Sequence, residues 1–167
     1  MKILVIFSLF TFHFSLLSAQ ECTSGDCING FGEYVYEDGS VYKGNFLDGK
    51  KNEEGNFQFA NGARYKGNYK NDEFHGAGVY YMVDGSVYDG EFVKGISNGK
   101  GQLTYADGTE YSGEFIDGRC NGSGTLYLEN GDVYSGEFKD DLFHSNGVFT
   151  YANGSVYTGE YKNGRRN

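Results

Sequence analysis

The sequence predicts an all-β protein, an elongated single-layer antiparallel ribbon of six stacked 23-residue β-hairpins. The 167 residues include 27 glycines, 15 tyrosines and 14 phenylalanines, with neither proline nor tryptophan. Frequent glycine argues against long helices, because each interior glycine costs about 1 kcal/mol relative to alanine. A disordered chain would rarely carry this many aromatic side chains. The third observation is a segment that recurs along almost the whole chain.

The N-terminal segment has the pattern of a secretory signal peptide. A charged Lys2 is followed by a mostly apolar stretch from Ile3 to Leu17 and by the small residue Ala19. The stretch is shorter than the roughly 20 residues of a membrane span, and an uncleaved signal anchor is the alternative. We expect cleavage of residues 1–19 near Ala19 and export to a periplasm, a cell surface or the extracellular space.

Six copies of one pattern occupy residues 29–167, after a short cap at residues 20–28. The copies read DGSVYKGNF, NGARYKGNY, DGSVYDGEF, DGTEYSGEF, NGDVYSGEF and NGSVYTGEY. Each copy contributes one turn glycine, and these recur every 23 residues: Gly39, Gly62, Gly85, Gly108, Gly131 and Gly154. The same period produces a row of tyrosines that is a candidate for interaction or for packing: Tyr42, Tyr65, Tyr88, Tyr111, Tyr134 and Tyr157.

Each copy is predicted to form a hairpin around its Asp-Gly or Asn-Gly pair, which is a strong hairpin signal between alternating strands. A two-residue loop would place Tyr34 and Tyr42 on opposite faces. A three-residue loop pairs these tyrosines, and Gly32 with Gly44, on one face. We therefore expect a type I turn closed by a bulged glycine, with positive φ at Gly39 and its copies.

This register predicts a sheet with two different faces. One face of the first hairpin carries Tyr34, Tyr36, Tyr42 and Phe46, and the other carries mostly polar residues. The pattern contains no helix or second sheet to cover the aromatic face. Exposed apolar patches of this kind usually mark interaction sites.

The string Tyr-x-Gly-x-aromatic, followed by a turn and Gly-x-Gly, resembles the MORN (membrane occupation and recognition nexus) repeat over about residues 29–164. The resemblance implies a meander of stacked hairpins. It also implies roles in scaffolding, dimerisation and, in some members, membrane or lipid association. Two features depart from the family: Phe or Tyr replaces its frequent Trp, and a net charge of −9 replaces its basic surface. The acidity disfavours the membrane role, and the lipid-kinase or methyltransferase domains of some members are not expected here.

The three cysteines fall into two groups. Cys22 and Cys27 precede the first hairpin, and in an exported protein a disulfide between them is expected to pin the N-terminal edge. Cys120 is then a free thiol, an intermolecular bridge, or the true partner of one of the other two.

The other candidate site residues are expected to have structural roles. His75 and His144 share a repeat position that is otherwise Asn, and they lie three repeats apart, so they are not expected to share a metal. Copies of a glutamate ladder should lie about 10 Å apart, too far for paired acids; its members are Glu91, Glu114, Glu137 and Glu160. Asn121 and Asn153 begin Asn-Gly-Ser glycosylation acceptors. We expect no catalytic residues, metal or cofactor.

The sequence therefore predicts an exported non-enzymatic scaffold whose aromatic face binds a protein partner or a second copy of the chain. Association with a membrane or cell-envelope surface is one alternative, and glycan or small-ligand recognition by the tyrosine row is another. The acidic charge argues against nucleic acid. Specificity should lie in positions that vary between repeats, such as Arg64, Tyr81, Glu110 and Tyr127.

Overall fold

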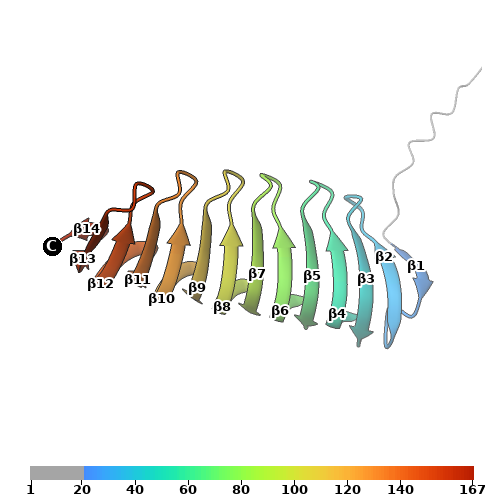
Figure 1. Cartoon of the computed structure of the whole chain (residues 1–167). Coiled ribbons are helices and arrows are strands. Elements are labelled where there is room, and N and C mark those ends of the chain that lie inside the picture. Colours follow the sequence, from blue (N-terminus) through green and yellow to red (C-terminus); the bar gives the residue numbers. More distant parts are fainter. Residues whose placement is uncertain (1–20) are drawn as a thin grey trace, which may run out of the picture.

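The computed structural model describes residues 21–167, which form one open antiparallel sheet of fourteen strands arranged in chain order (Figure 1). The predicted signal peptide at residues 1–19 lies outside the described residues. The strands are β1 (Glu21–Gly25), β2 (Phe31–Val35), β3 (Val41–Leu47), β4 (Lys50–Gln58), β5 (Arg64–Lys70), β6 (Glu73–Tyr81), β7 (Val87–Val93), β8 (Ile96–Thr104), β9 (Glu110–Ile116), β10 (Arg119–Tyr127), β11 (Val133–Lys139), β12 (Leu142–Thr150), β13 (Val156–Lys162) and β14 (Arg165–Arg166).

The six predicted hairpins are present, from β2–β3 to β12–β13, but two further strands extend the sheet. β14 is added after the last hairpin, and β1 precedes the first. Cys22 was expected before the first strand; instead it lies in β1, where it pairs with Tyr34 of β2. A strand forms there because the free edge of β2 carries backbone groups that an added strand can satisfy.

The predicted hairpin register is confirmed. Gly32 pairs with Gly44 and Tyr34 with Tyr42. The Gly39 amide donates to the Tyr36 carbonyl at 2.9 Å, which closes the turn. The φ angles of the six turn glycines range from 84° to 93°, a conformation that glycine adopts without steric cost.

A second kind of turn, which the sequence analysis did not identify, connects one hairpin to the next. It has two residues, as in Asp48-Gly49 between the paired residues Leu47 and Lys50. Both central residues have positive φ, 51° for Asp48 and 72° for Gly49, which defines a type I′ turn. Three of the six copies carry the Asp-Gly or Asn-Gly pair that marks a hairpin, and in the other three one residue of the pair is replaced.

A β-bulge near these turns bends the strands. The register slips between Gly67 and Tyr69 in the β5–β6 pair, and the matching slip recurs in the other inter-hairpin pairs. Bulges bend the strand that carries them. Phe74 pairs with Tyr69 along the ladder, yet its ring stacks on that of Tyr65 at 3.7 Å. The end of each hairpin therefore lies over the tyrosine row.

Within residues 21–167 neither a helix nor a second sheet covers the aromatic face, as expected, but the face is not left exposed. Tyr42, Tyr65, Tyr111 and Tyr134 are 0% exposed, and Tyr88 is 3% exposed. The covering comes from the sheet itself, because the bend folds each hairpin end onto the rings. We call this side of the sheet the inner face.

Candidate interaction surfaces

The tyrosine row is a packing row. The ring of Tyr42 lies against Gly44 and Gly55, and a Cβ at either glycine would collide with it. The Tyr42 hydroxyl donates to the carbonyl oxygen of Asn45 at 3.0 Å. The same bond, from Tyr to the carbonyl three residues later, recurs in the next four repeats. The Tyr-x-Gly pattern thus makes room for the ring and satisfies its hydroxyl within one repeat.

Burial in this row also moves ionisation of the tyrosines to higher pH. Loss of solvent contact raises the pKa of Tyr65, Tyr88 and Tyr134 to about 12. Neighbouring rings meet edge to face, as Tyr65 and Phe92 do at 5.2 Å between centroids. Five of the six rings are therefore enclosed along most of the row, whereas Tyr157 is only partly buried.

One further column of residues, which the sequence pattern did not single out, covers the tyrosines. We call these the lid positions, the second residue after each two-residue turn: Lys51, Phe74, Ser97, Cys120, Phe143 and Arg166. Phe74 and Phe143 stack on Tyr65 and Tyr134 at 3.7 and 3.8 Å. The 23-residue period could have revealed this column, but its residue types vary too much to suggest one role.

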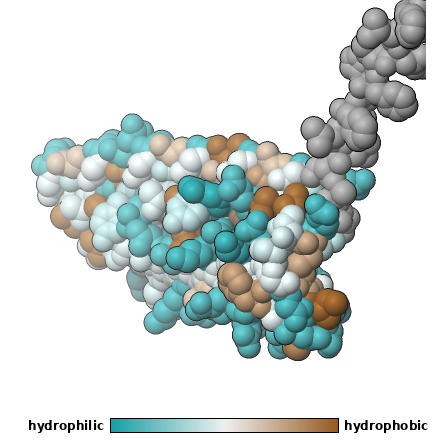
Figure 2. All heavy atoms as spheres, turned by 90° about the vertical axis from the view of Figure 1, so that its right-hand side faces the viewer, coloured by the Kyte–Doolittle hydropathy of each residue, from teal (hydrophilic) through white to brown (hydrophobic). Residues whose placement is uncertain are grey.

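The opposite side of the sheet, which we call the outer face, carries exposed apolar side chains. Phe31 is 57% exposed, Tyr81 39% and Tyr127 47%. In Figure 2, which faces the N-terminal end of the ribbon, hydrophobic residues stand in small groups among hydrophilic ones. The Arg64 guanidinium lies 5.1 Å from the centre of the Tyr81 ring, so two of the positions expected to confer specificity contact one another.

The outer face has a groove of about 740 Å³ in its N-terminal half, which we call the outer groove. It is lined by residues from β2 to β7 and therefore crosses several strands. Backbone at Gly55, Gly67 and Gly78 contributes to it. Its other residues combine apolar, cationic and acidic groups: Phe31, Lys43, Glu54, Asn56, Lys66, Asn68, Ala77, Val79, Tyr81 and Asp89.

The glutamate ladder lies on the same face as the outer groove. Glu91 faces Ala77 in the ladder of β6 and β7, and Glu114 faces Lys100. The carboxylate of Glu137 accepts a hydrogen bond from the Ser123 hydroxyl at 2.7 Å. The ladder thus borders solvent beyond the groove, in the C-terminal half of the outer face.

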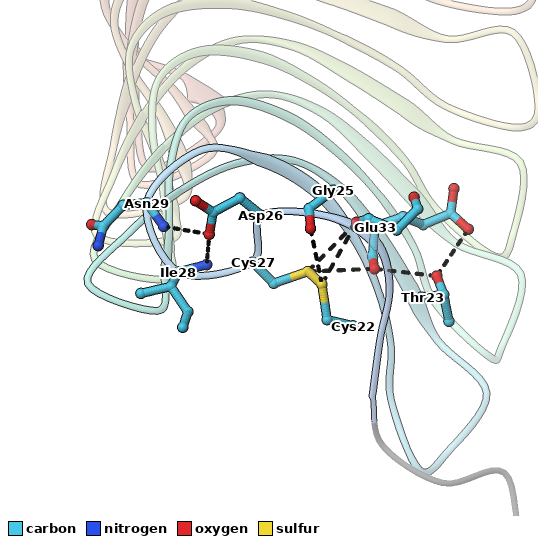
Figure 3. The surroundings of a disulfide bond; sticks show 9 residues. Cys22, Thr23, Gly25, Asp26, Cys27, Ile28, Asn29 and Glu33 are labelled. Carbon is cyan, nitrogen blue, oxygen red and sulfur yellow. Dashed lines mark hydrogen bonds between the residues drawn. A yellow bond between two sulfur atoms is a disulfide. The ribbon is translucent and has the colours of Figure 1, made fainter.

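The N-terminal edge is held by a disulfide between Cys22 and Cys27, whose Cα atoms are 6.0 Å apart (Figure 3). Asp26 accepts hydrogen bonds from the backbone amides of Ile28 and Asn29 within the same loop. Cys120 is a free, buried thiol. Burial, reinforced by the charge of the Asp141 carboxylate, raises the pKa of the Cys120 thiol to about 12.

The described residues contain no cluster of three or more His, Cys, Asp or Glu side chains placed to hold a metal ion. His75 and His144 lie in β6 and β12 respectively, in different hairpins. Within residues 21–167 no helix has the length and apolar character that a membrane crossing requires.

Comparison with known families matches the MORN repeat in seven consecutive segments, residues 28–41, 42–64, 65–87, 88–110, 111–133, 134–156 and 157–167. The chain belongs to the MORN repeat family. The matched segments run from one tyrosine of the row to the next, so the family pattern is the pattern that builds the inner face. The meander that the resemblance implied is therefore the fold of this MORN repeat protein.

The matches among solved structures include two TCP domains. The TCP domain of Drosophila melanogaster SAS-4 (dCPAP), in complex with a proline-rich motif of Ana2 (dSTIL), is 14% identical with a TM-score of 0.54. That match covers 84% of this chain and 78% of the other. The TCP10 domain of Danio rerio CPAP is 17% identical with a TM-score of 0.46, over 78% of this chain and 62% of the other. No curated protein sequence matches this chain.

Proposed function

We propose that this MORN repeat protein is a non-enzymatic scaffold that binds an extended segment of a protein partner in the outer groove. The observation that carries the proposal is the division between the two faces. The aromatic side chains of the inner face are buried in the core, whereas Phe31 and Tyr81 remain exposed beside a groove of about 740 Å³. Large exposed apolar groups next to a groove are typical of interaction sites.

The composition of the groove suits a peptide. Tyrosine and arginine are enriched at the centres of protein interfaces, and here Tyr81, which lines the groove, contacts Arg64. Lys43 and Lys66 supply positive charge, while Glu54 supplies negative charge. The SAS-4 domain with a related fold is described in complex with a proline-rich motif, which supports a polypeptide as the class of partner.

The partner is a different protein or a second copy of this chain, and the solution mass of residues 20–167 separates the two. We further propose that binding takes place after export. The disulfide between Cys22 and Cys27 supports an oxidising compartment, and the signal-peptide pattern agrees with it. Membrane binding is the weaker alternative, because the formal net charge of −9 opposes anionic lipid.

A site-specific photo-crosslinker tests the groove. Tyr81 and Tyr127 occupy the same repeat position and are similarly exposed, but only Tyr81 lines the groove. Benzoylphenylalanine at position 81 should give a crosslinked protein adduct in the native host, and the same residue at position 127 should not. Equal crosslinking at both positions, or none at position 81, would contradict the proposal. Liposome sedimentation with neutral and anionic lipid tests the membrane alternative.

A further inference from the structure

The first repeat holds a lysine inside a cage of aromatic rings. The Lys51 ammonium lies 3.3 Å from a carboxylate oxygen of Asp72 and 3.1 Å from the Tyr36 hydroxyl. It also lies 5.3, 5.8 and 5.4 Å from the ring centres of Tyr36, Tyr42 and Phe57. Cations are attracted to aromatic faces at such distances. The Lys51 side chain is only 13% exposed, so the cage encloses it.

The fourth repeat reproduces this cage without the lysine. Three repeats along the chain, Tyr105, Tyr111, Leu126, Asp141 and Cys120 stand where the first repeat has Tyr36, Tyr42, Phe57, Asp72 and Lys51. The backbone framework is the same. The Lys51 amide donates to the Asp72 carboxylate at 2.9 Å, and the Cys120 amide donates to the Asp141 carboxylate at 2.8 Å. The two sites differ in the lid residue and in Leu126, which stands in place of the Phe57 ring.

The short Cys120 side chain leaves a pocket of about 270 Å³ in the fourth repeat. Its lining includes the five residues that correspond to the lysine cage and three others: Tyr105, Asp107, Thr109, Tyr111, Cys120, Leu126, Phe138 and Asp141. The charge of Asp141 contributes to the raised pKa of Cys120 after the larger effect of burial, and to the raised pKa of Tyr105 after burial and the charge of Cys120. The negative field that opposes ionisation of these groups favours a cation in the same place.

The aspartate is specific to these two repeats. At the second residue of the two-residue turn the repeats have Gly49, Asp72, Gly95, Gly118, Asp141 and Gly164. All six have positive φ, including 72° for Asp72 and 68° for Asp141. Glycine is the favoured residue there. In the first repeat the aspartate pairs with Lys51, whereas among the described residues no cation pairs with Asp141.

We propose that the pocket beside Cys120 binds a primary alkylammonium group supplied from outside the chain, with Asp141 as counter-ion and the rings of Tyr105 and Tyr111 as cation–π partners. The ammonium belongs to a lysine side chain of a protein or to a free amine. The site uses the inner side of the sheet, so it is independent of the outer groove, and its success or failure does not decide the proposed function.

Titration with n-butylammonium at pH 7 and physiological salt, followed by ¹H–¹⁵N NMR, tests the site. Butylammonium matches the end of a lysine side chain, and n-butanol is its neutral counterpart. We expect saturable shifts at Tyr105, Tyr111, Cys120 and Asp141, with at least tenfold weaker binding of butanol. The variant Asp141→Asn keeps an acceptor for the Cys120 amide and should weaken butylammonium binding at least tenfold. Equal binding by Asp141→Asn, or shifts spread over all acidic residues, would overturn the proposal.

Exchange of the lid residues provides a reciprocal test. Cys120→Lys should supply the cation internally and abolish butylammonium binding, with the melting temperature retained. Lys51→Cys should create a second site, detected as new shifts at Tyr36 and Tyr42. Ser97→Lys is the matched control, because its repeat has Gly118 in place of the aspartate, and it should leave binding unchanged. Retained binding in a folded Cys120→Lys protein would contradict the assignment.

The source of the ammonium is identified by comparing butylammonium with the peptide Gly-Gly-Lys-Gly-Gly, blocked at both ends. Binding of the peptide at least tenfold more tightly than butylammonium indicates a lysine of a protein partner. Equal or weaker binding of the peptide indicates a free amine. Both results retain the alkylammonium site, and failure of both compounds to bind removes it.

Discussion

The inner and outer faces of this sheet use aromatic residues in opposite ways. On the inner face Tyr65 is 0% exposed, lies on glycine backbone and donates its hydroxyl to the Asn68 carbonyl. On the outer face Tyr81, which follows on a neighbouring strand, is 39% exposed and contacts Arg64. The contrast teaches that the repeated columns of this chain serve stacking between hairpins, while the varied columns remain available for partners.

The same contrast applies within the inner face, at the lid positions. Phe74 and Phe143 seal their tyrosines by stacking at 3.7 and 3.8 Å, whereas Cys120 leaves a pocket. A position that varies inside an otherwise uniform core is therefore as informative about binding as one on the surface.

Removal of an inner tyrosine should have the largest effect. Tyr65→Ala deletes a fully buried ring, its hydroxyl bond and its stack with Phe74, and should cost about 4 kcal/mol of unfolding free energy. Urea denaturation monitored by circular dichroism measures this cost. Tyr81→Ala on the outer face is the control and should cost about 0.5 kcal/mol. Equal losses of unfolding free energy in the two variants would show that the outer face contributes to stability as much as the inner face does.

Filling a glycine position of the inner face should be nearly as harmful. A Cβ at Gly78 would collide with the hydroxyl and ring of Tyr65, so Gly78→Val should destabilise by about 3 kcal/mol. The neighbouring Ala77 points to the outer face and is exposed. Ala77→Val should therefore change stability by less than about 0.5 kcal/mol in the same denaturation experiment. A tolerated valine at position 78 would argue against close packing of the row.

Loss of the disulfide should have a smaller and local effect. The bond between Cys22 and Cys27 closes a loop of sequence separation 5, so replacing both with serine should cost about 2 kcal/mol. Because β1 contacts only β2 in the sheet order, hydrogen exchange should increase in β1 and β2 and remain unchanged beyond β5. Faster exchange throughout the sheet would show instead that the edge controls the whole ribbon.

Alkaline pH should gradually lower the stability of the folded protein through the tyrosines of the inner face. The pKa of Tyr65, Tyr88 and Tyr134 is raised from 10.0 to about 12 in the folded protein. The stability that these tyrosines contribute is fully present below pH 10, where they are protonated in both the folded and the unfolded state. It is lost as pH rises through 12, because the tyrosines of the unfolded chain ionise first. We expect about 1 kcal/mol of stability to be lost per tyrosine at pH 11. Thermal melts between pH 8 and 11, alongside tyrosinate absorbance, would measure it, and a constant melting temperature would contradict enclosure of the row.

The sequence by itself determined the period, the hairpins and their register. These features are local: Asp-Gly or Asn-Gly at Gly39 and its copies sets the turn, and alternation over a few residues places Tyr34 opposite Tyr42. The MORN family assignment follows from the same columns. The disulfide between Cys22 and Cys27 was also expected from their spacing and predicted compartment.

Only the tertiary structure decided what covers the aromatic face and where a binding surface remains. The bulge in β6, opposite Gly67 to Tyr69 of β5, arises in the pairing of one hairpin with the next, so no single strand pattern reveals it. The resulting bend brings lid residues onto tyrosines nine positions earlier, as Phe74 lies on Tyr65. Burial of the row and the pocket beside Cys120 both follow from that bend, because they depend on how successive hairpins pack and not on the alternation within either one.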